Sequence, residues 1–437
     1  MKDRRDKQPA LPTTEDGKPL HLVHETWGDH EALLARTRSL PGGRVGVADT
    51  QVMDVAGAND PLQLERGGEL HPVALAYETY GELNARGDNA VLICHALTGS
   101  AHAAGVHARE EVPGWWDPLI GPGKPIDTNR WYVICSNVLG GCYGSTGPSS
   151  LDPATGRPYG PSFPRYTIRD MVRAQKRLSD RLGVTRFASI LGGSMGGMQV
   201  LEWAAIYPEM VGSIAPIAIG ARHSAWAIGL NEVARRAITA DPAWRGGRYR
   251  PGEQPETGLG LARAIAMLSY RSFDSLEAKF GRERVEERGD QATAAPSGQD
   301  VGADGDPVDA EARSDVLGRL MSVGFEIESY LSYQGVQLSK RFDANTYLYI
   351  TRAMDDHDVA EGRGRLRDVL KRITMPALVV GIDSDVLYPQ REQLELVEHM
   401  PNARYETLRS PHGHDAFLIE FPQLAAQLRR FLNEVAD

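Results

Sequence analysis

The stretch Leu191-Gly-Gly-Ser-Met-Gly-Gly197 places one serine among four glycines. It lies between a short apolar run, residues 187–191, and a segment with helical apolar spacing, residues 198–206. Glycine costs backbone entropy, so a cluster of glycines needs a geometric reason. In the G-x-S-x-G pattern the serine occupies a strained strand-to-helix turn, where small flanking residues let the neighbouring elements approach. A glycine-rich turn that merely contains serine is the alternative, but both flanks fit, so we predict that Ser194 is a nucleophile.

The bulk composition is ordinary for a soluble globular protein: of 437 residues, 41% are hydrophobic and 24% are charged. The formal net charge is −10 and no basic cluster is present, which argues against a nucleic-acid partner. Nowhere do 18 consecutive apolar residues occur, and residues 1–10 are polar. We therefore expect neither a membrane span nor a secretory signal.

The three cysteines, Cys94, Cys135 and Cys142, are an odd number without C-x-x-C spacing. They fit a reduced, cytoplasmic compartment better than a disulfide scaffold, and they give no zinc signature. Cys94 and Cys135 lie in apolar runs, where a small core residue is the simplest interpretation. The sequence thus indicates no metal and no tightly bound cofactor.

Strand-like and helix-like segments alternate along much of the chain, which favours an α/β fold with a mainly parallel sheet flanked by helices. Continuous apolar runs such as residues 90–94 are typical of strands covered on both faces. Residues 167–178 have helical spacing, with Thr167 as a candidate N-cap and Asp170 three residues later. The expected strands are residues 74–80, 90–94, 131–135, 187–191, 211–219, 376–381 and 404–408.

The chain divides into parts that differ in pattern. Residues 1–45 are polar and punctuated by proline and glycine, so we expect an extended or disordered lead-in. The strands lie in residues 46–219 and 372–437, and the helical block between them, residues 220–371, is interpreted as an inserted lid domain. Within that block, residues 289–315 hold seven acidic side chains, one basic side chain and almost no large apolar ones. This composition predicts a disordered insertion, to which we assign no catalytic role.

A serine at such a turn is inert unless a base takes its proton and a third group orients that base. In α/β hydrolases the partners follow in the order serine, acid, histidine, each on a loop after a later strand. The loop after the sixth expected strand offers Asp383 and Asp385. The loop after the seventh offers His412 and His414. Pattern alone leaves each pair open, although Gly413 allows a tight turn that would point His414 back at the serine.

Acyl chemistry also needs hydrogen-bond donors for a developing oxyanion. One donor is expected to be the backbone N–H of Met195, the residue after the nucleophile, at the start of its helix. The second is expected from the loop His95-Ala-Leu-Thr-Gly-Ser100, with the N–H of Leu97 as the candidate. Loss of one such donor typically lowers turnover on the order of a hundred- to a thousandfold.

Taken together, these words resemble the homoserine O-acetyltransferases of methionine biosynthesis, a family within the α/β-hydrolase superfamily. The resemblance covers roughly residues 47–435, and residues 289–315 depart from the family pattern. The matching words are Cys94-His-Ala-Leu-Thr-Gly99, Pro113-Gly-Trp-Trp-Asp117, Gly121-Pro-Gly-Lys124, Asn137-Val-Leu-Gly-Gly-Cys-Tyr-Gly-Ser-Thr-Gly-Pro148, Gly192-Gly-Ser-Met-Gly-Gly197, Arg341-Phe-Asp-Ala-Asn-Thr-Tyr347, Asp385-Val-Leu-Tyr-Pro389 and Gly413-His-Asp-Ala-Phe417.

The resemblance implies transfer of an acetyl group from acetyl-CoA, as co-substrate, to the hydroxyl of L-homoserine by double displacement. Ser194 would be acetylated, with His414 as the base and Asp385 orienting it. The resemblance thus favours this acid and this histidine over their neighbours in the two loops. It further implies a homodimer with lid helices at the interface.

By the same resemblance, Arg263, Tyr270 and Asp415 would hold the amino acid. Homoserine carries a carboxylate, which a guanidinium pairs with bidentately, and an ammonium, which an aspartate can anchor. Arg263 precedes Tyr270 by seven residues, or two helical turns, so both can face one side of a helix. Without the resemblance Arg263 would read as a surface arginine. Arg222 is the main rival for the carboxylate.

Three kinds of function remain open on this sequence. The transferase is favoured over a serine esterase or hydrolase, which would use the same triad but pass the acyl group to water. A catalytically silent binding protein is disfavoured because no triad position is missing. Within the transferases, succinyl-CoA could replace acetyl-CoA, or serine could replace homoserine. A succinyl group should need another cation near Leu97, and none is evident.

Overall fold

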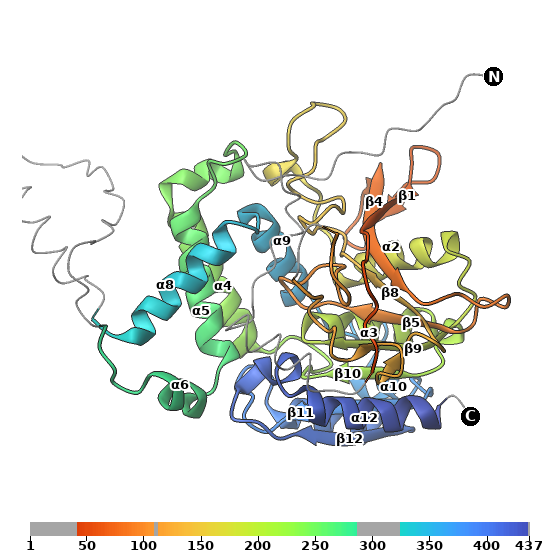
Figure 1. Ribbon diagram of the computed structural model, residues 1–437. Coiled ribbons are helices and arrows are strands. Elements are labelled where there is room, and N and C mark those ends of the chain that lie inside the picture. The colour runs from red at the N-terminus through yellow and green to blue at the C-terminus, as the bar shows by residue number, and fades with distance from the viewer. Residues whose placement is uncertain (1–41, 109–111, 286–323, 436–437) are drawn as a thin grey trace, which may run out of the picture.

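The computed structural model describes residues 42–108, 112–285 and 324–435 (Figure 1). Most of the expected lead-in, residues 1–45, lies outside the described residues, and the acidic insertion at 289–315 lies outside them entirely. Within the described ranges, no helix combines the length and the hydropathy needed to cross a bilayer.

An eight-stranded sheet forms the centre of the molecule, in the order β1-β4-β8-β5-β9-β10-β11-β12. The first two pairs in this order are antiparallel, and every later pair is parallel (Figure 1). This is the mainly parallel sheet that the sequence predicts. The strands are β1 (Gln51–Ala56), β4 (Val73–Tyr80), β5 (Ala90–Cys94), β8 (Tyr132–Ser136), β9 (Phe187–Gly193), β10 (Ile214–Ile217), β11 (Ala377–Ile382) and β12 (Ala403–Leu408).

Alternate residues of the central strands pack on opposite faces of the sheet. In β5, Val91 and Ile93 belong to the apolar cluster that contains α12 (Phe421–Glu434). Leu92 and Cys94 belong to the cluster that contains α3 (Met195–Ile206). Coverage on both faces explains why the whole strand is apolar.

Helix α2 (Ile168–Arg181) begins where the sequence predicts, because Thr167 and Asp170 form a capping box. The N–H of Thr167 donates to Asp170 Oδ2 over 2.9 Å. Short elements complete the core: β2 (Leu62–Gln63), β3 (Glu69–Leu70), β6 (Ile120–Gly121), β7 (Ile126–Asp127), η2 (Gly160–Ser162), η3 (Pro208–Met210), α11 (Gln390–His399) and η5 (Gly413–Leu418).

Between β10 and β11 the described chain forms helices and no strand. Helices α4, α5, α8 and α9 gather beside the sheet in Figure 1, and α5 packs against both α4 and α8. We refer to the helices between β10 and β11 as the lid helices. They are α4 (Ala225–Ala240), η4 (Pro242–Gly247), α5 (Glu256–Tyr270), α6 (Phe273–Phe280), α8 (Glu326–Ser339), α9 (Ala344–Asp355) and α10 (Leu366–Leu370).

Candidate active site

Ser194 lies between β9 and α3 in a conformation that L-residues rarely adopt, with φ 56° and ψ −128°. Its N–H donates to Ile217 O over 3.0 Å, which ties the turn to β10. The glycines on either side allow close backbone contacts. A Cβ on Gly192 would lie 2.8 Å from Cys94 O, and one on Gly196 would lie 2.1 Å from the same oxygen. The glycine cluster is therefore what lets the turn pack against the end of β5.

His414 and Asp385 form a hydrogen-bonded pair, with 2.7 Å between His414 Nδ1 and Asp385 Oδ2. The other carboxylate oxygen, Oδ1, accepts the N–H of Leu387 over 2.8 Å and that of Tyr388 over 2.9 Å. These amides fix the carboxylate, so the imidazole must donate its Nδ1–H to it. His414 Nε2 is buried and has no hydrogen-bond partner among the described residues, which leaves it available to accept a proton.

The two rival side chains make other contacts. Asp383 Oδ1 accepts the N–H of Ser410 over 2.9 Å and so braces the loop after β12. His412 Nδ1 lies 3.3 Å from Ser275 Oγ of α6. Between the two histidines, Gly413 has φ +68°, the left-handed conformation that turns the chain there. The structure thus pairs the second acid of one loop with the second histidine of the other.

The two candidate oxyanion donors follow the ends of neighbouring strands: Leu97 comes shortly after β5, and Met195 shortly after β9. These two strands pair through Cys94 and Gly192. No hydrogen bond within the described ranges uses the N–H of Leu97 or of Met195. The ring of His95 steadies the loop, with Nδ1 2.7 Å from Ala96 O and Nε2 accepting the N–H of Val138 over 3.1 Å. Burial lowers the pKa of His95 to about 4, so the ring is neutral and its Nδ1–H is the donor.

Arg263 and Tyr270 both lie on α5, and Arg263 is 1% exposed rather than on the surface. Its guanidinium carbon lies 6.0 Å from the centre of the Tyr270 ring, and that ring lies 5.8 Å from the ring of His414. Asp415 is also buried. Burial raises its pKa to about 6, against the opposing effects of Arg271, Arg263 and His414. The three predicted substrate-binding side chains therefore gather next to His414.

Arg222, the rival for a carboxylate, is not part of this group. Its side chain is 57% exposed and lies 3.8 Å from Glu395 of α11. An exposed, screened ion pair of this kind contributes little binding energy. The structure separates it from the buried cation on α5.

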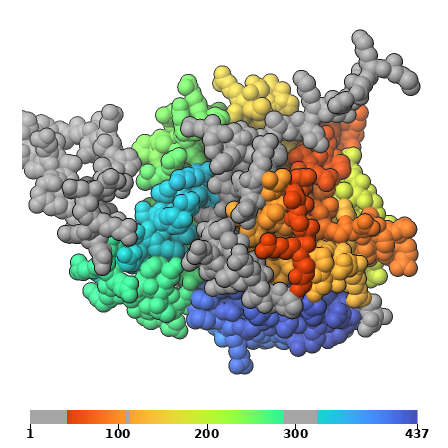
Figure 2. Space-filling model, viewed as in Figure 1, coloured from red at the N-terminus to blue at the C-terminus, as the bar shows by residue number. Residues whose placement is uncertain are grey.

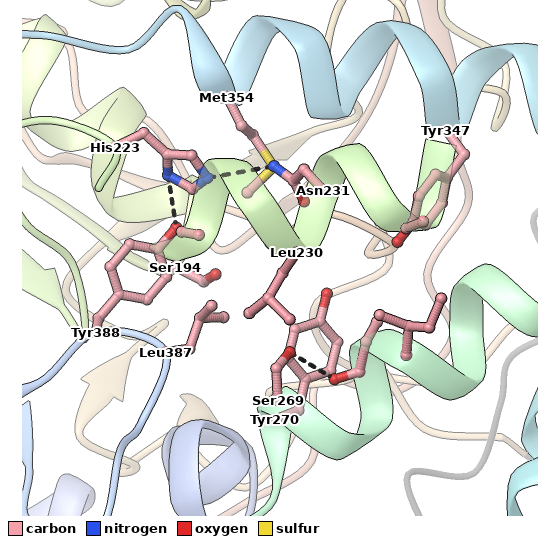
Figure 3. Close-up of a pocket in the computed structure, with 14 residues that line it drawn as sticks. Ser194, His223, Leu230, Asn231, Ser269, Tyr270, Tyr347, Met354, Leu387 and Tyr388 are labelled. Carbon is pink, nitrogen blue, oxygen red and sulfur yellow. Dashed lines mark hydrogen bonds between the residues drawn. The ribbon is translucent and has the colours of Figure 1, made fainter. Parts of the chain in front are cut away.

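A narrow pocket reaches Ser194, with an empty volume of about 380 Å³ that includes its opening to solvent (Figure 3). Lid helices α4, α5 and α9 and the loop after β11 supply most of the lining. Sequence reasoning missed five polar lining residues, of which Ser269 lies directly before the predicted Tyr270. Tyr347 and Tyr388 stand within words that match the family, whereas no sequence signal marks His223 or Asn231.

One buried cluster in the described part of the chain has the spacing of metal ligands: Glu78, His102 and His107. Each carboxylate oxygen of Glu78 lies 2.9 Å from an imidazole nitrogen. Thr50 and Tyr80 also donate their hydroxyls to this carboxylate, over 2.7 and 2.9 Å. These hydrogen bonds satisfy the buried charge of Glu78. They also connect β4 to the segment that follows the loop at residues 95–100.

Ser194 and the pair of Asp385 and His414 follow the carboxyl ends of the parallel strands β9, β11 and β12. This is the arrangement of an α/β hydrolase with a serine nucleophile. Residues 89–421 match the family model described as the alpha/beta hydrolase fold. The homoserine O-acetyltransferase of Carboxydothermus hydrogenoformans is 51% identical over 399 residues, which are 90% of this chain and 97% of that protein. That of Moorella thermoacetica is 50% identical and covers 86% of this chain and 94% of its own. The chain belongs to the homoserine O-acetyltransferase family.

Two solved structures are similar to this one at lower identity. The homoserine O-acetyltransferase from Bacillus anthracis has a TM-score of 0.76 and 29% identity, over 89% of this chain and 98% of that chain. Esterase E22 also has a TM-score of 0.76, with 28% identity over 88% of this chain and 100% of its own. The fold is thus shared by a transferase and by an esterase, so the acyl acceptor has to be argued from the pocket.

Proposed function

We propose that the protein transfers an acetyl group from acetyl-CoA to the hydroxyl of L-homoserine through an acetyl-Ser194 intermediate. The observation that carries this proposal is the hydrogen bond between Asp385 and His414, which leaves the buried Nε2 of His414 without a partner among the described residues. This imidazole lies at the same edge of the sheet as Ser194. Membership of the homoserine O-acetyltransferase family supports the choice of donor and acceptor.

In the first half-reaction His414 Nε2 takes the proton of Ser194 as the hydroxyl oxygen attacks the thioester carbonyl. The N–H groups of Met195 and Leu97 would stabilise the tetrahedral oxyanion. The carbon–sulfur bond then breaks, and the CoA sulfur leaves with the proton that His414 carries. The acetyl group remains on the serine oxygen.

In the second half-reaction homoserine enters, and His414 takes the proton of its hydroxyl as that oxygen attacks the acetyl carbonyl. Arg263 would pair with the carboxylate and Asp415 with the ammonium, which sets the hydroxyl next to the imidazole. The ester bond to Ser194 breaks, and the serine oxygen recovers its proton from His414. O-acetylhomoserine leaves.

Hydrolysis is the second candidate, favoured by the similarity of fold to esterase E22. A buried cation and a buried anion beside the catalytic histidine speak for transfer, because water needs neither. A serine acceptor or a succinyl donor would leave the triad unchanged.

Two measurements test the proposal. Acetyl-CoA alone should add one acetyl mass to the intact protein, and Ser194→Ala should abolish that adduct while the variant stays folded. Purified enzyme should then be offered acetyl- and succinyl-CoA against homoserine, serine and water, with thiol release and product mass read together. An adduct that persists in the alanine variant would overturn the assignment, as would thiol release that continues over many turnovers when water is the only acceptor.

We also propose a cytoplasmic homodimer. The three cysteines are buried and free, which fits a reducing compartment. Large apolar side chains on the outer faces of the lid helices are exposed, which fits contact with a second copy. Those on α4 and α5 are Trp226, Val233, Leu261 and Leu268.

A further inference from the structure

A chain of buried polar side chains runs from the lid to the pocket at Ser194. Tyr388 Oη lies 3.1 Å from His223 Nδ1, and Asn231 Nδ2 lies 3.2 Å from His223 Nε2 (Figure 3). The same amide nitrogen donates to Asp355 Oδ1 over 2.9 Å. Arg235 lies 2.7 Å from the other oxygen of that carboxylate. Tyr388, His223 and Asn231 all line the pocket.

The donor and the acceptor of each hydrogen bond in this series can be assigned by starting from Asp355. Asp355, paired with the guanidinium of Arg235, can only accept, so the Asn231 atom that faces it is the NH₂ group. The second N–H of that NH₂ group faces His223 Nε2, which must therefore be the unprotonated acceptor. A direct hydrogen bond between His223 and Asp355 is excluded by distance, since Nε2 lies 3.8 Å from the carboxylate.

A neutral histidine carries its single proton on the other nitrogen. Burial, with Arg235 nearby, lowers the pKa of His223 to about 4, in agreement with this state. His223 Nδ1–H consequently donates to the oxygen of Tyr388, and the phenol proton has to point elsewhere. Burial raises the pKa of Tyr388 well above its usual value, so that proton stays on the oxygen.

We propose that Tyr388 is a substrate-contacting hydrogen-bond donor, which His223 orients toward a carboxylate oxygen of the amino-acid acceptor. The inference rests on the proposed function. In the proposed mechanism two backbone amides donate to the oxyanion, and the ammonium group needs an acceptor rather than a donor. The carboxylate is therefore the substrate group that can accept a hydrogen bond from Tyr388. The rings of Tyr388 and Tyr270 lie 5.2 and 5.8 Å from the ring of His414. The Arg263 guanidinium carbon lies 6.0 Å from the Tyr270 ring, so both donors lie close to the proposed position of the acceptor.

The test is Tyr388→Phe, measured separately in the two half-reactions. Acetylation by acetyl-CoA should change little, whereas transfer to homoserine should lose on the order of ten- to a hundredfold in kcat/KM, mainly through KM. With 3-aminopropan-1-ol, which is homoserine without its carboxylate, the variant and the wild type should react equally slowly. This selective loss is what a contact to the carboxylate requires.

Two further variants separate the contact from general damage. Tyr166→Phe removes another buried hydroxyl, which has no partner among the described residues, and should leave both half-reactions unchanged. His223→Leu should misdirect the phenol and reproduce part of the selective loss for homoserine.

Slower acetylation in Tyr388→Phe would place its hydroxyl on the acyl group instead and overturn the proposal, as would an equal loss with both acceptors. If the wild type itself forms an acetyl-enzyme but does not acetylate homoserine, the proposed function fails, whatever Tyr388 does.

Discussion

Asp415 is a buried carboxyl that has to be ionised to anchor an ammonium group. Burial raises its pKa to about 6, so the neutral form is populated at mildly acidic pH. A carboxyl whose pKa is raised on folding stabilises the folded state only at low pH, and that contribution is lost as pH rises through about 6. The charged carboxylate that the proposed ammonium contact requires therefore costs stability at neutral pH.

We therefore expect the KM for homoserine to rise as pH falls through about 6, approaching tenfold per pH unit below it. Acetylation by acetyl-CoA, followed as the mass adduct, should not share this step because no ammonium takes part. Asp415→Asn should have a high KM for homoserine at every pH, and this KM should no longer depend on pH near 6. A homoserine profile that parallels the acetylation profile would contradict the role of Asp415.

Sequence reasoning predicted the serine from its turn and narrowed the acid and the histidine to one pair each; the family resemblance favoured Asp385 and His414, which the structure joins by a hydrogen bond. It did not predict the hydrogen-bonded polar side chains in the pocket. Ser194 carries a local signature, because its neighbours must be small for the turn to form. His223 and Tyr388 are 165 residues apart and meet only in the folded protein. A hydrogen bond of that kind leaves no periodicity or spacing to read.

The turn between β9 and α3 is where backbone packing constrains the sequence most tightly. Gly193 and Gly197 also face neighbours, since an added Cβ would lie 2.5 Å from the ring of Phe417 and 2.6 Å from Ile219 respectively. Each of the four glycines in the quoted stretch is thus required by a close contact, and two of them, Gly192 and Gly196, face the same backbone oxygen. Ser194 is therefore held in its turn by packing as well as by hydrogen bonds.

Gly196→Ala should show this directly, because its Cβ would lie 2.1 Å from Cys94 O, a backbone atom that cannot rotate away. Pushing β5 and α3 apart should cost at least about 2–3 kcal/mol in the free energy of unfolding and abolish acetylation. Gly57→Ala, where nothing lies within 4 Å, should stay within about 0.5 kcal/mol of the wild type. Denaturant unfolding checks both variants, and a stable, active Gly196→Ala protein would refute the packing argument.

Elements with strong local signals were predicted within a few residues, and those that depend on neighbours were not. β5 has the predicted bounds, since its five apolar residues have no other place than the core. β10 was expected over 211–219 but covers Ile214–Ile217, because the N–H of Gly212 donates to Phe187 O outside the ladder. β1 was not predicted, since this antiparallel edge strand is half-exposed and its pattern is weak.

The lid helices carry large apolar side chains on the molecular surface, and no described residue covers them. Trp226 and Val233 are 58% and 54% exposed on α4 and are seven residues apart, so they lie on one face. Leu261 and Leu268 repeat this spacing on α5, with 54% and 51% exposed. Helices α4 and α5 pack against each other, and the lid helices lie together at one side of the molecule (Figure 2). We infer that the exposed pairs contribute to an interface.

A second copy of the chain is the occupant we propose, so light scattering should give twice the chain mass of 47.8 kDa. Trp226→Glu combined with Leu261→Glu should place charges in the interface and yield folded monomers. Leu394→Glu changes a side chain that is 48% exposed on α11, outside α4 and α5, and should remain dimeric. A wild-type protein that stays monomeric at micromolar concentration would contradict the dimer. Because Ser194, His414 and the pocket lining all belong to one chain, the monomers should still form the acetyl-enzyme.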